Sequence, residues 1–378
     1  MKTDERRLRA LKGLKWSKYD KGVLPAWVAD MDFAPAPEIV SVIQEMIDLT
    51  DFGYRYHDVD LLISTWCDWM DRSHGWRPPL DQCLTFTSSM SALEAAMVLH
   101  SQPGDGVVLF SPIYQPFRTA IEQSKRKVVD VYLEGPAWKF DGNRFEDALD
   151  SDTRVVLFCQ PHNPTGRVYT QKEIDEFAGI VEDHDLLVIS DEIWADLTFD
   201  GIKHLSLYPN NERLQDRTVT IGSASKAFNL AGARCSVAHI GSSRVREELE
   251  KFPEHYFGLN SSFGAAATVA AWTVGESWLQ EVRIQIEENR NYLHSRINDE
   301  SSGLSMHLPQ ATYLAWLDFS NTRLADNPSK RLLEEAKIAL EPGSKFGTQC
   351  GSYARLNFAT SRNILETIAD RILKTVNQ

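Results

Sequence analysis

A lysine in a turn of small residues is the most reactive side chain that the sequence singles out. Lys226 stands in the string Ser223-Ala224-Ser225-Lys226, directly after the short apolar run 219–221. A lysine amine forms a Schiff base with an aldehyde only when it is partly deprotonated, which burial and neighbouring cations favour. Ser223, Ser225 and Arg234 can bind a phosphate group beside it. By itself such a string is more often a solvated loop, so the interpretation depends on the rest of the chain.

A carboxylate and a side-chain amide follow two further apolar runs. Asp191 comes after the run 186–189, and open α/β sheets bind ligands at the carboxyl ends of their strands. An aspartate there can pair with a protonated pyridine nitrogen and keep the ring an electron sink. Asn163 follows the run 155–158 in the tight turn 160–166 and can donate a hydrogen bond to a phenolic oxygen of the ring. Alone, such an Asn-Pro-Thr-Gly turn is usually only a turn.

Apolar runs and helical patterns alternate through the middle of the chain. Between two runs, Thr170 and Glu173 predict a capping box at the start of a helix over 171–185. This alternation predicts an α/β layer sheet. The runs that suit buried strands are 107–110, 155–158, 186–189, 219–221 and 237–240.

The pattern changes after residue 258. A long helical stretch over about 263–296 is followed by strand-like runs at 313–317 and 353–358, which predict a smaller α+β unit. We therefore expect a large domain at 46–270 and a small domain that joins residues 1–45 to residues 271–378. A cleft between two such domains is a favoured ligand site.

The composition restricts the partners and the compartment. The 378 residues carry a net charge of −13 with scattered lysines and arginines, so nucleic acid is not an expected partner. No secretory signal and no membrane-spanning apolar run is visible, which predicts a cytoplasmic protein without a membrane partner. The cysteines form no C-x-x-C pair, so we expect reduced core thiols and no metal site. They are Cys67, Cys83, Cys159, Cys235 and Cys350.

Taken together and in this order, the strings around Asn163, Asp191 and Lys226 resemble the fold-type I pyridoxal 5′-phosphate (PLP) enzymes, the aminotransferase class I/II superfamily. The resemblance covers nearly the whole chain and implies a large domain with a mostly parallel seven-stranded sheet plus a smaller α+β domain. It implies that Lys226 holds PLP as a Schiff base, that Asp191 pairs with the pyridine nitrogen and that Asn163 binds the phenolic oxygen. The implied phosphate contacts are Ser223, Ser225, Arg234 and the backbone N–H groups of Ser89 and Met90 at a helix N-terminus.

The same family assigns three further positions. Tyr114 matches the aromatic residue that stacks on the pyridine ring, although a tyrosine there can equally fill a core. Arg355 matches the arginine that binds the substrate α-carboxylate through two parallel hydrogen bonds; its alternative is a surface salt bridge. The segment Phe52-Gly53-Tyr54 resembles the one whose tyrosine reaches the cofactor phosphate of the neighbouring subunit. The resemblance thus implies a homodimer with active sites at the interface.

Several strings are similar, within the superfamily, to the cystathionine β-lyase-like branch, the cysteine-S-conjugate β-lyases. This implies a PLP-dependent carbon–sulfur β-lyase that cleaves cystathionine or S-substituted cysteines to a thiol, pyruvate and ammonia by α,β-elimination. Trp27, Ala29 and Asn163 would then lie near the amino acid substrate, and Trp194 near the cofactor. Trp27 and Trp194 have simple packing roles as alternatives. The strings are 27–33, 52–54, His162, 190–194 and 226–232.

Two other functions stay open. A PLP-dependent aminotransferase, acting on an amino acid and a 2-keto acid, would use every residue named above. Arg234 favours it, because aminotransferases commonly carry an arginine there and many β-lyase-like relatives do not. The second alternative is a PLP-binding regulatory protein, although no DNA-binding segment is visible. The loops expected to contact the sulfur substituent carry no recognisable signature.

Overall fold

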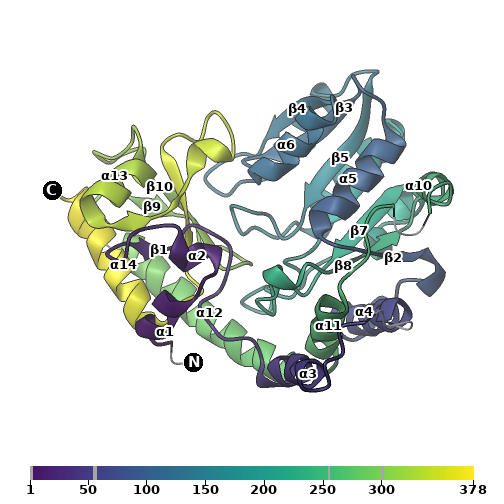
Figure 1. Ribbon diagram of the computed structural model, residues 1–378. Coiled ribbons are helices and arrows are strands. Elements are labelled where there is room, and N and C mark those ends of the chain that lie inside the picture. The colour runs from purple at the N-terminus through teal and green to yellow at the C-terminus, as the bar shows by residue number, and fades with distance from the viewer. Residues whose placement is uncertain (1–2, 54–57, 254–255, 299–301) are drawn as a thin grey trace.

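A seven-stranded sheet forms the centre of the computed structural model, which describes residues 3–53, 58–253, 256–298 and 302–378 (Figure 1). The strand order is β2-β8-β7-β6-β5-β3-β4. Strands β4, β3, β5, β6 and β7 run parallel, whereas β8 is antiparallel to both β7 and β2. The predicted mostly parallel seven-stranded sheet is confirmed. Its strands are β2 (Cys83–Phe86), β3 (Gly106–Ser111), β4 (Lys127–Tyr132), β5 (Thr153–Cys159), β6 (Leu187–Asp191), β7 (Thr218–Gly222) and β8 (Ser236–Ile240).

The central strands are the ones that the sequence predicts. β3, β6, β7 and β8 are buried along their whole length, because helices cover both faces of the sheet. The outer strands β2 and β4 have partly exposed residues and no continuous apolar run. For this reason the sequence pattern did not reveal them.

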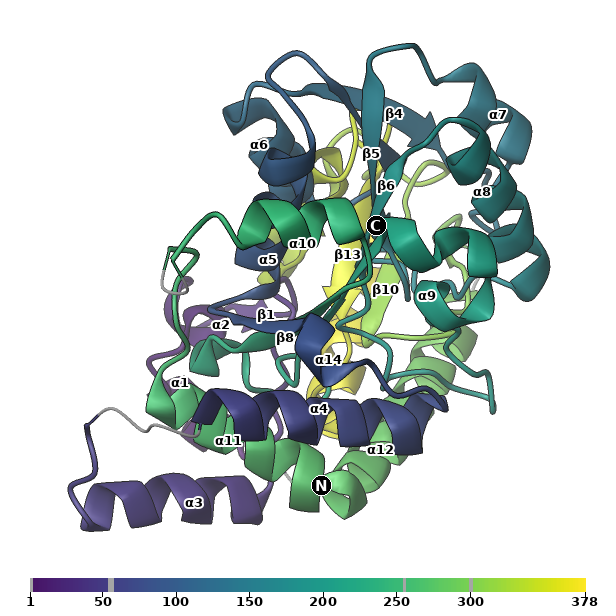
Figure 2. The same ribbon diagram turned by 90° about the vertical axis from the view of Figure 1, so that its right-hand side faces the viewer.

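Alternate residues of the strands face two separate helix layers (Figure 2). Val107 and Leu109 of β3 pack with one layer, whereas Val108 and Phe110 pack with the other. The first layer contains α5 (Ser89–His100), α6 (Gln115–Gln123) and α10 (Ser243–Leu249). The second contains α7 (Gly142–Asp147), α8 (Gln171–Asp183) and α9 (Leu207–Asn210). The predicted capping box of α8 is present, with Thr170 and Glu173 bonded to each other's backbone.

A four-stranded antiparallel sheet in the order β12-β13-β10-β9 forms the second unit, on the left in Figure 1. The N-terminal β1 (Leu24–Pro25) pairs with β11 (Ile338–Ala339) beside it. Among the described helices, none is long and apolar enough to cross a membrane. The other elements of this unit are α1 (Glu5–Ala10), α2 (Leu14–Ser17), α12 (Glu276–Asn298), β9 (Ser305–Met306), β10 (Leu314–Asp318), α13 (Pro328–Arg331), β12 (Glu341–Pro342), the short helix η5 (Gly343–Lys345), β13 (Tyr353–Asn357) and α14 (Arg362–Val376).

The helical stretch predicted over 263–296 is two helices, α11 (Ser262–Val274) and α12. Gly275 separates them, and a Cβ atom there would stand 2.6 Å from the carbonyl oxygen of Ala271 and 2.7 Å from the ring of Phe228. α11 packs against α3 (Pro37–Asp48) and α4 (Asp58–His74). The domain limits predicted at 46 and 270 fall inside α3 and α11, and the division at these limits stays a prediction.

Candidate functional site

Four adjacent parallel strands bring the predicted site residues to one edge of the large sheet. Lys226 follows β7, Asp191 ends β6, Asn163 follows β5 and Tyr114 follows β3. Because parallel strands place their carboxyl ends at the same edge, residues far apart in the sequence meet there. Arg355 reaches the same place from β13 of the second unit.

These side chains line one cavity of about 470 Å³ between the two sheets. Of the predicted site residues that the structure describes, only Ser223 is not part of its wall. The Ser223 hydroxyl lies behind Ser225, 2.7 Å from its Oγ, and donates to the carbonyl oxygen of Cys235. Tyr54 lies outside the described residues. The predicted residues in the wall are Trp27, Ala29, Ser89, Met90, Tyr114, Asn163, Asp191, Trp194, Ser225, Lys226, Arg234 and Arg355.

The amine of Lys226 is held inside this cavity. Its Nζ donates a hydrogen bond to the carbonyl oxygen of Ala29 at 3.1 Å and lies 5.6 Å from the centre of the Trp194 ring. Burial lowers the pKa of this amine and outweighs the negative charges of Asp30 and Asp191, which raise it, while the positive charge of Arg355 lowers it further. A larger fraction of the amine is therefore neutral, which is the form that can attack a carbonyl or accept a proton.

Asp191 is a buried carboxylate with few hydrogen bonds to offset the cost of removing its charge from water. It is 5% exposed, and burial raises its pKa to about 7. It accepts one long hydrogen bond, from the backbone N–H of Ile193 at 3.4 Å. A buried carboxylate in this state gains most from a cationic ligand that donates a hydrogen bond to it.

Arg355 is a buried arginine with one N–H group that has no hydrogen-bond partner among the described residues. The side chain is 3% exposed and donates through Nη1 to Asn163 Oδ1 at 3.0 Å and through Nη2 to the carbonyl oxygen of Trp27 at 2.9 Å. Its buried Nε finds no hydrogen-bond partner among the described residues. A ligand carboxylate would satisfy it. Because the Asn163 oxygen accepts from Arg355, its amide nitrogen is directed as a donor to other groups.

Groups that suit a phosphate gather in another part of the cavity. Helix α5 begins at Ser89, with Ser88 as its N-cap, so the N–H groups of Ser89 and Met90 belong to the first turn and have no acceptor within the helix. The hydroxyl of Ser225 and the exposed side chain of Arg234 line the same cavity. Helix N-terminus, hydroxyl and guanidinium together form an anion site.

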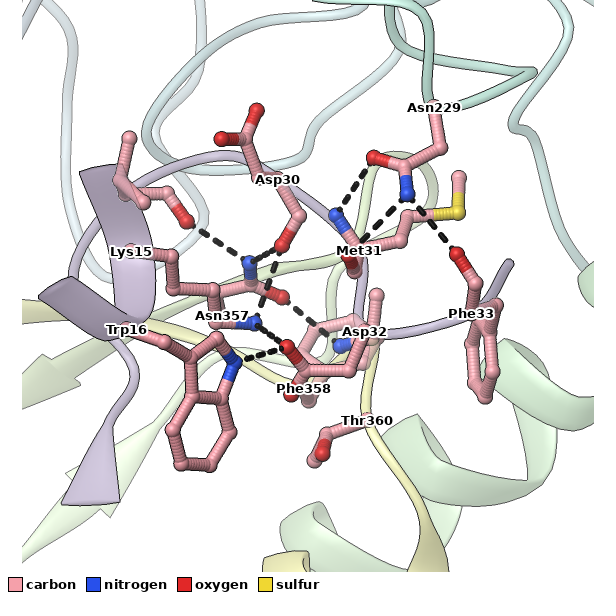
Figure 3. Close-up of polar contacts among 12 residues, drawn as sticks. Lys15, Trp16, Asp30, Met31, Asp32, Phe33, Asn229, Asn357, Phe358 and Thr360 are labelled. Atoms are coloured by element: carbon pink, nitrogen blue, oxygen red, sulfur yellow. Dashed lines mark hydrogen bonds and ion pairs between the residues drawn. The ribbon is translucent and has the colours of Figure 1, made fainter. Parts of the chain in front are cut away.

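The sequence did not reveal two asparagines that hold the N-terminal segment against the cavity (Figure 3). Asn357, two residues after Arg355, donates to the carbonyl oxygens of Val28 and Asp30 at 2.8 and 2.6 Å. The bonded carbonyls flank Ala29, whose own oxygen accepts from Lys226. Asn357 therefore fixes the backbone that positions the lysine amine.

Asn229, three residues after Lys226, binds the same segment from the other side (Figure 3). It accepts from the backbone N–H of Met31 and donates to the carbonyl oxygens of Met31 and Phe33. A buried ion pair between Lys15 and Asp32, with N and O 3.0 Å apart, adds a further tie. The segment is thus bonded both to the turn that carries Lys226 and to the strand that carries Arg355.

We expect Asn357→Ala to destabilise the protein by about 2–4 kcal/mol, because the carbonyl of Val28 loses its side-chain donor, that of Asp30 keeps only Lys15, and the N–H of Ala359 loses its acceptor. Urea unfolding measures this. Asn363→Ala, at an exposed position in the first turn of α14, is the matched control and should change the free energy of unfolding by less than about 0.5 kcal/mol. Equal effects of the two substitutions would contradict the role of Asn357.

An open α/β sheet with a ligand cavity at its carboxyl edge, closed by a second unit, is typical of a large class of enzymes that bind phosphorylated ligands there. The model of the family "Aminotransferase class I and II" matches residues 29–372. The chain belongs to this family.

Close relatives cover the whole chain. It is 33% identical to the cystathionine beta-lyase PatB of Bacillus subtilis, over 98% of this chain and 99% of that protein. It is 30% identical to a cystathionine beta-lyase of Corynebacterium glutamicum, over 97% of each chain. The crystal structure of cystalysin from Treponema denticola, which contains pyridoxal 5′-phosphate, matches with a TM-score of 0.92 and 27% identity over 99% of this chain and 98% of that chain.

Proposed function

We propose that this protein is a PLP-dependent carbon–sulfur β-lyase that converts cystathionine or other S-substituted cysteines to a thiol, pyruvate and ammonia. The observation that carries the proposal is the meeting of a half-buried lysine, a buried carboxylate and a buried arginine in one cavity. The relatives named cystathionine beta-lyase over their full length support the reaction type.

The residues of the cavity fit the cofactor. Among the described residues no cation forms an ion pair with Asp191, whose pKa is raised, and a protonated pyridine nitrogen would supply one. Tyr114 lies in the wall, where its ring can stack on a flat heterocycle. The anion site formed by the first turn of α5, Ser225 and Arg234 suits the phosphate. The Nδ2 group of Asn163 can donate to the phenolic oxygen.

Different side chains of the cavity bind the substrate and transfer the proton. When bound, PLP withdraws electrons from the Cα atom of an attached amino acid and so stabilises negative charge there. Arg355 binds the α-carboxylate and fixes the orientation of Cα. Lys226 removes the Cα proton, since its lowered pKa makes the neutral amine available. The carbonyl of Ala29 holds that amine in place before the substrate arrives.

The elimination has a simple balance. The Cα–H and Cβ–S bonds break and a Cα=Cβ double bond forms from the Cα–H electron pair. The Cβ–S electron pair leaves with the sulfur as a thiolate, which is protonated. One water molecule is consumed when the remaining three-carbon fragment is hydrolysed to pyruvate and ammonia. No oxidant or reductant is needed.

A test of the reaction separates the lyase from the aminotransferase, which Arg234 in the cavity wall also suits. Incubated with PLP and L-cystathionine, the purified protein should release pyruvate and thiol in equal amounts without an added keto acid. Turnover that requires a keto acid would instead establish an aminotransferase. Binding of PLP without turnover of either kind would favour the regulatory protein.

We further propose a homodimer in the cytoplasm. Large apolar side chains are exposed on α3 and just after it, at Val40, Ile47, Leu49 and Phe52, as expected of a surface that a partner covers. The predicted contact of Tyr54 with the neighbouring phosphate would follow directly. Sedimentation at twice the mass of one chain is the expected result, and sedimentation as a single chain would contradict the dimer. All five cysteines are free and buried, as in a reducing compartment.

A further inference from the structure

Two charged side chains of the cavity have no part in the chemistry described so far. Within the described part of the chain, six charged side chains contribute to its wall. Asp191, Lys226, Arg234 and Arg355 are accounted for by the cofactor, the proton transfer and the α-carboxylate. Glu341 and Lys345 remain.

Glu341 stands next to the arginine that would bind the substrate. In the pairing of β12 with β13, Glu341 is the direct partner of Arg355, so both side chains lie on the same face of the small sheet. The Glu341 side chain is only 13% exposed, and its charge acts on the pKa of both Tyr114 and Arg355. This carboxylate therefore belongs to the interior of the substrate space.

Lys345 lies farther out. It ends η5, the short helix that follows β12, and its side chain is 43% exposed. Its Nζ is 2.6 Å from Glu341 Oε1. The two residues thus present a negative charge inside and a positive charge toward the opening, within one hydrogen bond of each other. A partly exposed ion pair of this kind contributes little to folding stability. Stability alone therefore does not explain why the pair lies in the cavity wall.

We propose that Glu341 and Lys345 determine substrate specificity by binding the far end of the sulfur substituent. The favoured substituent ends in both an ammonium and a carboxylate group. The ammonium would bind Glu341 and the carboxylate would bind Lys345, so that the ligand replaces the ion pair that the two side chains make with each other. This inference rests on the proposed lyase function and adds the residues that would select among its substrates.

The charges can be tested one at a time with four substrates that share the same reacting end. These are S-propyl-L-cysteine, S-(2-aminoethyl)-L-cysteine, S-(2-carboxyethyl)-L-cysteine and L-cystathionine. Glu341→Gln should lower kcat/KM about 10-fold for the aminoethyl compound and cystathionine, mainly through KM. Lys345→Gln should do the same, by about 10-fold, for the carboxyethyl compound and cystathionine. These losses are measured relative to the propyl compound, whose uncharged substituent reports any effect of the substitutions on the reacting end.

A second measurement avoids turnover. Calorimetry on the Lys226→Ala protein, with and without each of the two substitutions, should show the same pattern in the dissociation constants of the four compounds. Equal losses for all four compounds would mean that the pair only supports the fold of the cavity, and unchanged values for all would mean that it does not touch the substrate; either result overturns the proposal. If the parent releases no thiol even from S-propyl-L-cysteine, the lyase function itself fails, and this inference fails with it.

Discussion

Replacing Lys226 by alanine is expected to slow thiol release from L-cystathionine by about 10⁴-fold or more, because one side chain supplies both the cofactor attachment and the base that takes the Cα proton. The side chain is half-buried, its amine is bonded to the Ala29 carbonyl and the pKa of the amine is lowered, and these are the properties that both tasks need. Initial rates of thiol release measure the effect. The folded state should survive, since alanine leaves no buried charge behind.

The matched control is Lys251→Ala. Lys251 is exposed just after α10, where its Nζ pairs with Glu248, and it is not part of the cavity wall. We expect its loss to leave kcat/KM within about 2-fold of the parent value, because surface substitutions of this kind rarely change more than about 0.5 kcal/mol. A Lys226→Ala protein that kept a rate within about tenfold of the parent would refute the role of Lys226 as base.

Asp191→Asn is expected to lower kcat about 10²–10³-fold with PLP bound, since the substitution removes a charge aimed at the ring and keeps nearly the same shape. Stopped-flow absorbance of the loaded protein measures the rate of Cα proton removal directly. Ser190 lies beside it in β6, but its hydroxyl donates to Glu192 and serves the core. Ser190→Ala is thus a neighbouring control that should affect stability more than rate. An equal rate loss in both variants would contradict a specific role for the Asp191 charge.

The same substitution has an opposite effect on the cofactor-free protein. Asp191 has a folded-state pKa of about 7 against an ordinary value of 3.8, so the folded state holds this proton more tightly than the unfolded state. The contribution of Asp191 to the stability of the cofactor-free protein therefore falls as the pH rises from about 4 to about 7. At pH 8 we expect Asp191→Asn to be more stable than the parent by about 2–4 kcal/mol, and at pH 4 nearly equal. Urea unfolding at both pH values tests this; a parent protein that is the more stable one at pH 8 would contradict it.

The large sheet could be predicted because its inner strands are continuous apolar runs. Each run that the sequence showed, from 107–110 to 237–240, is a strand of the model, and the chemistry-bearing residues follow the strands directly. Strand ends place such residues together whatever the lengths of the helices between them. The edge strands β2 and β4 lack this signal, since their exposed positions interrupt the apolar pattern.

The support of the site could not be read from the sequence. Asn229 binds backbone carbonyl groups about 200 positions away in the sequence, and Asn357 binds carbonyl groups about 330 positions away. Every residue has a backbone carbonyl, so the residue types do not show which of them accept these hydrogen bonds. Their closeness to Lys226 and Arg355 in the chain was the one available signal. Glu341 was hidden for a related reason: it reaches the cavity only because β12 pairs with β13 in a particular register.

The central claim is that the ε-amine of Lys226 binds PLP covalently, and one experiment addresses it directly. The purified protein is saturated with PLP, reduced with borohydride, digested and mapped by mass spectrometry. The account predicts that the cofactor is found on the peptide that contains Lys226 and that the Lys226→Ala protein carries none at any fixed position. Stable attachment to a different lysine, or no attachment at saturating PLP, would contradict it.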